Sequence, residues 1–248
     1  RFMLANMQGF DPNKDLLSID KMLVLDQWIV SKTADLQSQV VNEYDEYNFH
    51  LAMKMILNFC TNDLGGFYLD IIKDRQYTTQ TDSLARRSAQ SALYHIAHAM
   101  VRWMAPVLSF TAEEFWQYLP GASNESVFLQ TWYEDLVGDF NNSAIDSARD
   151  VNIHLRKELE EMRRDKVIGS SLDAEVDVYC NDENYRVLGE LKDELRFVFI
   201  TSDARIHLLS EKPKEATDID KCLAIMVIKS SHQKCVRCWH HREEIGAN

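Results

Sequence analysis

The chain has 248 residues, of which 46% are apolar and 27% are charged, a composition typical of a folded globular protein. Its formal net charge of −12 argues against a generic nucleic-acid coat, which is basic, but allows a specific RNA binder whose cations lie on one face. No apolar run reaches the length of a membrane span, so we expect no membrane partner. The five cysteines, an odd number, indicate a reducing cytoplasmic compartment rather than a disulfide framework.

The first half of the chain has the periodicity of long helices. Residues 1–6 lack a starting Met, a signal-peptide charge pattern and a helix cap, so we expect the middle of a helix cut from a longer polypeptide. Asp20 and Asn48 are the predicted N-caps of the second and third helices, and Asp82 or Ser83 that of the fourth. Short connections between these helices favour antiparallel neighbours in a bundle.

A pair of glycines, Gly65-Gly66, lies inside the third predicted helix. Each glycine costs about 1 kcal/mol relative to alanine in a helix interior. The pair therefore predicts close packing of a neighbouring helix or a local kink.

Residues 106–120 carry signals for a short capped helix bounded by prolines. Thr111 and Glu114 fit a capping box, and Phe110 and Phe115 are spaced for a hydrophobic staple. We predict a short buried helix that holds the longer helices together.

After Gly121 the pattern changes to that of a small α/β unit. A helix is predicted over residues 143–166, and alternation over residues 174–180 predicts a strand whose exposed face carries Glu175 and Asp177. A further helix over residues 185–195 is followed by strands near residues 197–201, 205–209 and 223–229.

Cys235 and Cys238 have the Cys-x-x-Cys spacing of one zinc knuckle. A structural zinc takes four ligands, and the chain ends before a second pair. Two interpretations remain open: half of a four-cysteine zinc site, or a redox pair in a freestanding helical interaction protein. The terminal position does not offer the strand and helix of a thioredoxin-type pair, and the neighbouring Trp239 and cations favour a ribbon that contacts RNA.

Several segments, in chain order, resemble those of one family. They are residues 2–10, 67–77, the 106–116 motif P-x-L-x-F-T-A-E-E-x-W, 159–174 and 235–239. Together they resemble the C-terminal anticodon-binding region of bacterial class I isoleucyl-tRNA synthetases. The helical motif alone is shared with valyl relatives, a third interpretation that the Cys-x-x-Cys-Trp sequence disfavours.

The resemblance implies a mostly α fold in three parts. Residues 1–138 are expected to form the antiparallel anticodon-binding bundle, and residues 139–230 a junction helix with a small α/β domain. Residues 231–248 are expected to form a truncated zinc-ribbon knuckle, the first half of a ribbon.

The resemblance also implies a function and a set of partners. The full-length ligase joins isoleucine to tRNA(Ile) using ATP and hydrolyses mischarged valyl-tRNA in a separate domain. The HIGH and KMSKS motifs of catalysis are absent here, so we expect no catalytic residue and no activity from this fragment alone. The expected partners are tRNA(Ile) and the catalytic and editing domains of the same chain, with ATP and isoleucine bound only through the catalytic domain. We expect a monomer, and zinc in the full-length protein but not stably in this fragment.

An anticodon is a single-stranded loop, so cations that hold its phosphates and side chains that read or stack its bases are needed. Taken singly, each cation is more often a solvated charge or part of an intramolecular ion pair. The candidate tRNA-binding residues are Lys73, Arg75, Arg86, Arg87, Arg102, Arg156, Arg163, Arg164, Lys166, Arg237 and Trp239. The candidate metal ligands are Cys235 and Cys238.

Overall fold

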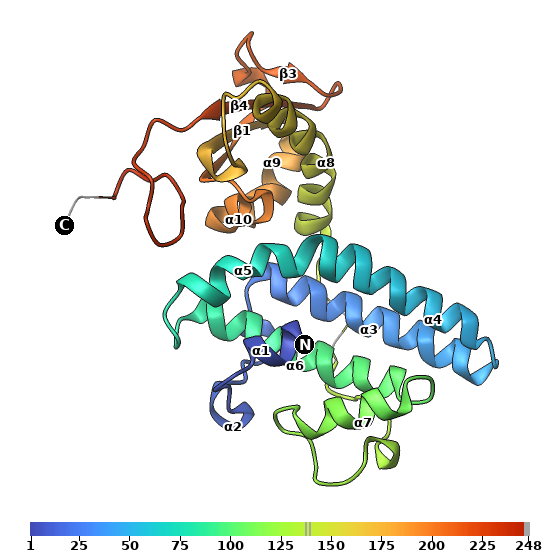
Figure 1. Ribbon diagram of the computed structural model, residues 1–248. Helices are drawn as coiled ribbons and strands as arrows, with labels where there is room; N and C mark the ends of the chain where they lie inside the picture. The colour runs from blue at the N-terminus through green and yellow to red at the C-terminus, as the bar shows by residue number, and fades with distance from the viewer. Residues whose placement is uncertain (137, 139, 246–248) are drawn as a thin grey trace. The chain divides into compact units, whose positions relative to one another are not determined.

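The computed structural model of the chain describes residues 1–136, 138 and 140–245 (Figure 1). The described residues are mostly helical, as predicted, with one four-stranded sheet. The chain divides into two compact units, Arg1–Phe140 and Asn141–Asn248. Within the described residues, no helix combines the length and the apolar character that crossing a membrane requires.

The first unit is entirely helical. Its long helices α3 and α6 pack against one another, and α3 also packs against α4, which lies alongside it in Figure 1. Trp28 of α3 and Trp103 of α6 are buried in its core. The α-helices of this unit are α1 (Phe2–Asn6), α2 (Pro12–Asp15), α3 (Val24–Asp45), α4 (Phe49–Asn58), α5 (Leu69–Thr78), α6 (Leu84–Met104) and α7 (Ser109–Gln117). The short elements are the 3-10 turns η1 (Ile19–Lys21) and η3 (Val127–Leu129) and the π-helix η2 (Phe59–Tyr68).

The predicted helix starts are partly right. Asn48 and Ser83 occupy the N-cap positions of α4 and α6, and the Ser83 hydroxyl accepts a hydrogen bond from the Arg86 amide. Asp20 does not cap α3, because it lies in the 3-10 turn η1 and α3 begins at Val24.

The glycine pair lies in η2, where α4 passes into α5 through π-helical turns. A Cβ atom on Gly66 would lie 2.9 Å from the carbonyl oxygen of Thr61, and one on Gly65 would lie 3.0 Å from that of Cys60. In each case the obstacle is a backbone carbonyl five residues earlier in the chain. Five residues is also the spacing of the hydrogen bonds in a π-helix. The structure therefore shows a wider helical turn, which the glycines permit, rather than close packing of a neighbouring helix.

The cap predicted for the short helix is wrong. Helix α7 begins at Ser109, which places Thr111 inside the helix, and the N-cap residue Leu108 makes no side-chain cap. Phe110 is 94% exposed and so makes no staple contact with Phe115. Glu113 instead caps a neighbouring element, since its Oε2 accepts hydrogen bonds from the Ser126 hydroxyl and the Val127 amide at the start of η3.

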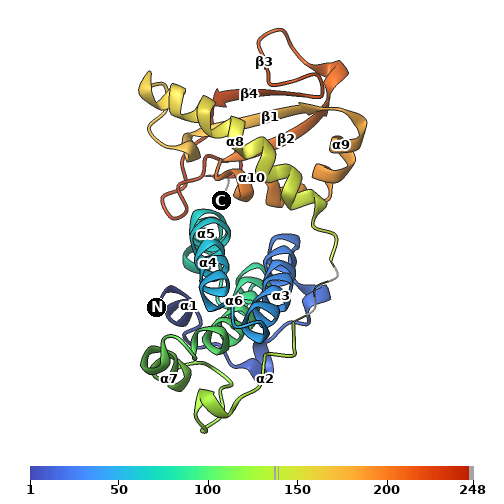
Figure 2. The ribbon, with the colours of Figure 1, turned by 90° about the vertical axis from the view of Figure 1, so that its right-hand side faces the viewer.

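The second unit packs helices on a mixed sheet with strand order β2-β1-β4-β3. Strand β1 is parallel to β2 and antiparallel to β4, which is antiparallel to β3. Helix α8 lies across the sheet in Figure 2, and it contacts β4. The helices are α8 (Ser143–Arg164), α9 (Asp182–Gly189) and α10 (Leu195–Phe199); the strands are β1 (Ala174–Cys180), β2 (Asp203–Leu208), β3 (Thr217–Asp218) and β4 (Leu223–Lys229); the 3-10 turns are η4 (Ser171–Asp173), η5 (Lys192–Glu194) and η6 (Leu209–Glu211).

Three of the four predicted strands are confirmed as β1, β2 and β4. The strand predicted at residues 197–201 is wrong. Leu195, Val198 and Phe199 are buried at the three- and four-residue spacing of a helix, and they belong to α10.

Strand β1 is buried on both faces, contrary to the predicted exposed face. Glu175 and Asp177 are only 5% and 6% exposed. Arg205, the neighbour of Asp177 in β2, places its Nε 2.7 Å from Asp177 Oδ1 and its Nη1 2.9 Å from Glu175 Oε2. The two carboxylates are therefore covered by a guanidinium group that also supplies their counter-charge.

Candidate nucleic-acid interface

Four of the predicted cations lie on the C-terminal half of α8 and just beyond it. The helix buries Val151, Leu155 and Leu159 at four-residue spacing, which leaves Arg156 and Arg163 on its exposed surface. Arg164 ends the helix and is exposed as well. Cations in the last turn are favourable because they face the negative end of the helix dipole.

The ion pairs of these cations are few and solvent-exposed. Arg163 Nη1 lies 2.7 Å from Glu160 Oε1, and Arg164 Nε lies 3.7 Å from Asp165 Oδ1. Surface pairs of this kind contribute about 0–1 kcal/mol, so their cations can exchange a carboxylate for a phosphate at little cost. Arg156 and Lys166 are exposed and pair with no carboxylate in the part of the chain that the structure describes.

The Cys-x-x-Cys segment folds as a tight loop with its base anchored to the second unit. The Cys235 amide donates to the His240 carbonyl over 2.8 Å, and the Trp239 amide donates to the Cys235 carbonyl over 2.9 Å. His240 is buried beside Phe197, with ring centroids 5.7 Å apart. The loop tip therefore presents Arg237 and the Trp239 ring, which is 62% exposed, to solvent.

The loop carries two free thiols, those of Cys235 and Cys238, at the spacing of a pair of zinc ligands. Backbone amides of Cys238 and Arg237, together with the Cys238 side chain, lower the pKa of the Cys235 thiol. A thiolate is the form that ligates zinc or reacts as a nucleophile. Within residues 1–136, 138 and 140–245, no cluster of three or more His, Cys, Asp or Glu side chains is arranged to hold a metal. The described residues therefore do not fit a complete four-ligand zinc site.

In the first unit, Lys73 is exposed and Arg86 and Arg87 are partly covered. Lys73 Nζ lies 2.7 Å from Asp70 Oδ1 on the surface of α5. Arg87 is held by Asp15, with Nη2 and Oδ1 3.2 Å apart, and by Gln90. Arg86 has a buried Nε without a hydrogen-bond partner among the described residues.

Arg75 is not available to RNA, which corrects the prediction for this residue. Its side chain is 1% exposed, and its Nη1 lies 3.1 Å from Oδ2 of Asp26, which is fully buried. The role of Arg75 is therefore structural.

Arg102 is likewise held inside the first unit. Its Nε donates to the Thr131 carbonyl over 3.0 Å, and its Nη1 donates to the His98 carbonyl. The guanidinium lies over the rings of Trp116 and Tyr133, at 4.7 and 5.2 Å from their centroids. Burial lowers the pKa of Arg102. Its contacts tie α6 to Trp116, Thr131 and Tyr133.

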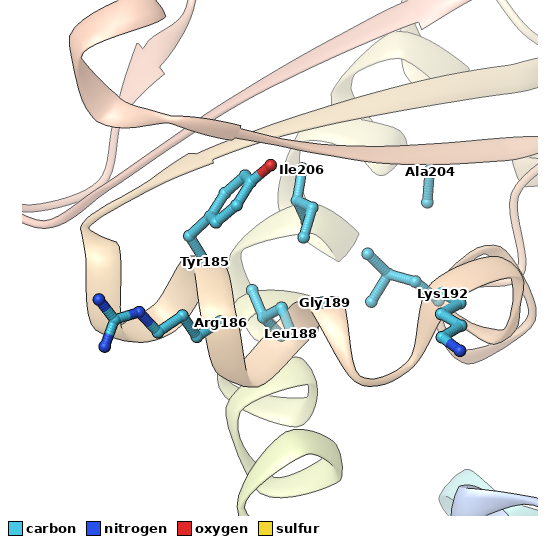
Figure 3. Close-up of a pocket in the computed structure, with 8 residues that line it drawn as sticks. Tyr185, Arg186, Leu188, Gly189, Lys192, Ala204 and Ile206 are labelled. Atoms are coloured by element: carbon cyan, nitrogen blue, oxygen red, sulfur yellow. The ribbon is translucent and has the colours of Figure 1, made fainter.

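A pocket of about 420 Å³ lies between α9, the following turn and strand β2 (Figure 3). Tyr185, Leu188 and Gly189 line it from α9, and Ala204 and Ile206 line it from β2. Arg186 and Lys192 border it on opposite sides in Figure 3. The sequence pattern over residues 185–195 predicts a helix with an apolar face and does not single out these two cations.

Comparison with known proteins decides the family. Residues 26–178 match the family model described as the anticodon-binding domain of tRNA ligase. The chain belongs to this family. The matched residues run from α3 through α8 into β1, so this anticodon-binding chain carries the family pattern in both of its compact units.

Its curated relatives include several long ligases. The isoleucine--tRNA ligase of Ruthia magnifica subsp. Calyptogena magnifica is 58% identical over 248 residues, which are all of this chain and 27% of that protein. The isoleucine--tRNA ligase of Nitrosococcus oceani is 52% identical over 254 residues, again covering the whole chain and 27% of the relative. That of Vesicomyosocius okutanii is 48% identical over 283 residues, with 29% of the relative covered. The anticodon-binding chain thus spans between a quarter and a third of the length of these relatives.

Proposed function

We propose that the chain binds tRNA, and isoleucine tRNA in particular, as the recognition part of an isoleucine--tRNA ligase. The family match over residues 26–178 carries this proposal, and the names of the relatives supply the amino acid. The exposed cations of α8 and of the Cys-x-x-Cys loop support it, because they can attract RNA phosphates although the chain as a whole has a net charge of −12.

The proposed contacts are the predicted residues that remain accessible. Arg75, Arg87 and Arg102 are left out, because each is held by groups of the first unit. The retained set is Lys73, Arg86, Arg156, Arg163, Arg164, Lys166, Arg237 and Trp239. Its cations would hold phosphates, and the exposed Trp239 ring would stack on an unpaired base.

We further propose that the whole protein attaches isoleucine to tRNA(Ile) with ATP, using catalytic and editing domains outside this sequence. The three-part division at residues 1–138, 139–230 and 231–248 is retained in this proposal, as is a monomeric state. Cys235 and Cys238 would then be two of four zinc ligands, with the second pair supplied by residues outside this sequence. The five free cysteines support a reducing compartment, the cytoplasm.

A filter-binding titration with isoleucine and valine tRNAs across a salt series tests the proposal. Isoleucine tRNA should bind more tightly, and log K should fall linearly with log salt because phosphate contacts release counterions. Equal binding of both tRNAs would assign the chain to general RNA binding. Salt-independent or undetectable binding would overturn the proposal.

A thiol function is the second candidate, because the pKa of Cys235 is lowered. An experiment on the full-length protein distinguishes this thiol function from the zinc-ligand role. Stoichiometric zinc release on treatment with a thiol-specific mercurial supports the ligand role. A reversible disulfide between Cys235 and Cys238 without zinc release supports the redox role.

A further inference from the structure

The pocket between α9 and β2 is lined by residues that share one face of the helix and residues that share one face of the strand. Tyr185, Leu188 and Gly189 are three and four residues apart on α9, so they share one helix face. Ala204 and Ile206 are two residues apart on β2, so they share one face of the strand. Strand β2 is at the edge of the sheet, which leaves this hollow without a further strand beside it.

The absence of a side chain at Gly189 keeps the hollow open. A Cβ atom there would lie 3.6 Å from Ile206 Cδ1, an ordinary contact, so an alanine fits while a longer side chain would project into the pocket. The Tyr185 ring, 39% exposed, stands beside Ile206 in Figure 3. The pocket thus has an apolar floor with one accessible aromatic wall.

Two cations line this pocket. Arg186 and Lys192 are exposed, and neither forms an ion pair or a side-chain hydrogen bond with a residue that the structure describes. Glu190 and Asp193 are neighbours in sequence, yet neither lines the pocket. On a chain with 39 acidic and 27 basic residues, these two cations border a hollow whose lining includes no carboxylate.

The backbone after α9 includes a residue in the left-handed region. Lys192 has a φ of 46°, in the left-handed region that favours glycine. A lysine held in this conformation costs free energy, and such residues concentrate at binding sites. The turn brings Lys192 to the pocket side opposite Arg186 (Figure 3).

We propose that this pocket is a slot for one unpaired RNA base, with Arg186 and Lys192 binding the phosphates on either side of the inserted nucleotide. The volume of about 420 Å³ falls within the range of small-ligand sites. Single-stranded RNA is recognised by splaying out a base onto an aromatic ring while cations follow the backbone. An apolar protein segment would fill the floor but would leave both cations without a counter-charge. The slot rests on the proposed tRNA binding and adds to it a subsite on the α9–β2 edge.

The test uses the 248-residue chain and an isoleucine tRNA transcript labelled with fluorescein, with binding followed by anisotropy. Gly189→Leu fills the slot and should raise Kd about tenfold, the effect of losing one stacked base. Gly189→Ala is the matched control and should change Kd less than twofold. The double variant R186Q/K192Q should lower the slope of log K against log salt by about 1.4, the value for two single-strand phosphates.

A contact map gives a readout that does not depend on folding of the variants. In transcripts that carry 4-thiouridine at single-stranded positions, ultraviolet crosslinks located by mass spectrometry should fall on Tyr185 or an adjacent residue of α9. Unchanged Kd in Gly189→Leu and unchanged salt slope in R186Q/K192Q, with no crosslink to α9, would overturn the slot and leave an apolar protein segment as its occupant. In that outcome wild-type affinity for isoleucine tRNA still stands. If the wild-type chain binds no tRNA, the proposed function itself fails.

Discussion

Arg75 and Asp26 form a buried ion pair that joins α5 to α3. Nη1 lies 3.1 Å from Oδ2, and the two side chains are 1% and 0% exposed. Asp26 also accepts hydrogen bonds from the hydroxyls of Tyr68 in η2 and Ser88 in α6. Four helical elements of the first unit therefore meet at one carboxylate.

Replacing Arg75 by methionine should lower the free energy of unfolding of the first unit by about 3–5 kcal/mol, because it leaves a buried carboxylate without its counter-charge. Urea unfolding followed by circular dichroism measures the loss. Lys73→Met, which breaks an exposed pair on the same helix, is the control and should cost less than about 1 kcal/mol. If both variants lost the same small amount of unfolding free energy, the buried pair would contribute no more to stability than the exposed one.

His95 and His98 make the first unit sensitive to mild acid. Burial lowers the pKa of each to about 4, and the Pro120 carbonyl offsets part of this effect at His98. The unfolded chain binds protons near pH 6.5 while the folded unit does not. Stability is therefore full above pH 6.5 and is lost as pH falls toward 4, by up to about 3 kcal/mol per histidine.

Urea titrations at pH 7 and pH 4.5 test this dependence. His95→Gln should reduce the difference between the two pH values, whereas His50→Gln, on the exposed surface of α4, should preserve it. An unchanged pH difference in His95→Gln would mean that other groups govern acid sensitivity.

Arg205 holds two buried carboxylates in the sheet. Burial would raise the pKa of Glu175 and of Asp177, but hydrogen bonds from Ser230 to Glu175, from His207 to Asp177 and from Arg205 to both outweigh it and leave both pKa values below their usual range. A lowered carboxyl pKa gives stability that is present above the unfolded-state value and lost as pH falls through the folded-state value.

The variant Arg205→Met should reverse this pH dependence in the second unit. Without the guanidinium, burial dominates, so the variant should be destabilised by about 3 kcal/mol at pH 7 and should regain stability as pH falls toward 4. Thermal unfolding at several pH values measures it. A parallel loss at every pH would show that Arg205 acts through packing alone.

The exposed cations of α8 should act on RNA affinity and not on stability. Arg156→Gln should reduce the slope of log K against log salt for tRNA by about 0.7–0.9, the contribution of one phosphate contact. Lys221→Gln, in the exposed loop between β3 and β4, removes the same charge and should leave the slope unchanged. Equal slopes for both variants would make the effect one of net charge.

The cysteines should react with iodoacetamide in a defined order. Hydrogen bonds to the Cys235 sulfur lower its pKa, whereas burial raises the pKa of Cys60 and raises that of Cys180 to about 11. Since the thiolate is the nucleophile, Cys235 should be alkylated before Cys60 and Cys180 at pH 7.5. Peptide mapping by mass spectrometry gives the order, and earlier labelling of Cys60 would contradict it.

Local pattern predicted the long helices and three strands well, because periodicity reports directly which residues face a core. The local pattern failed where a residue distant in the sequence determines whether a side chain is buried. Glu175 and Asp177 read as an exposed face, since the alternation could not show that Arg205 would cover them. Arg75 read as a surface cation, since its partner Asp26 lies 49 positions earlier. Thr111 and Glu114 matched a capping box, yet the N-cap lies three residues earlier, at Leu108, and Glu113 capped another element.

The candidate site could also be predicted only in part. Exposed cations on α8 and the Cys-x-x-Cys loop could be found from residue type and spacing. The α9–β2 pocket could not, because it depends on which strand lies at the sheet edge and on the fold of the turn at Lys192.

The π-helical stretch η2 sets the rotational phase between α4 and α5. A π-helix advances the chain around its axis less per residue than an α-helix, so the face that α5 turns inward differs from the one a continuous α-helix would present. Arg75 follows η2 on α5 and pairs with Asp26 of α3, so its alignment with Asp26 depends on this phase. The chain can therefore gain or lose a residue in its loops far more readily than between residues 59 and 68, where one deletion would swing a buried cation away from its carboxylate.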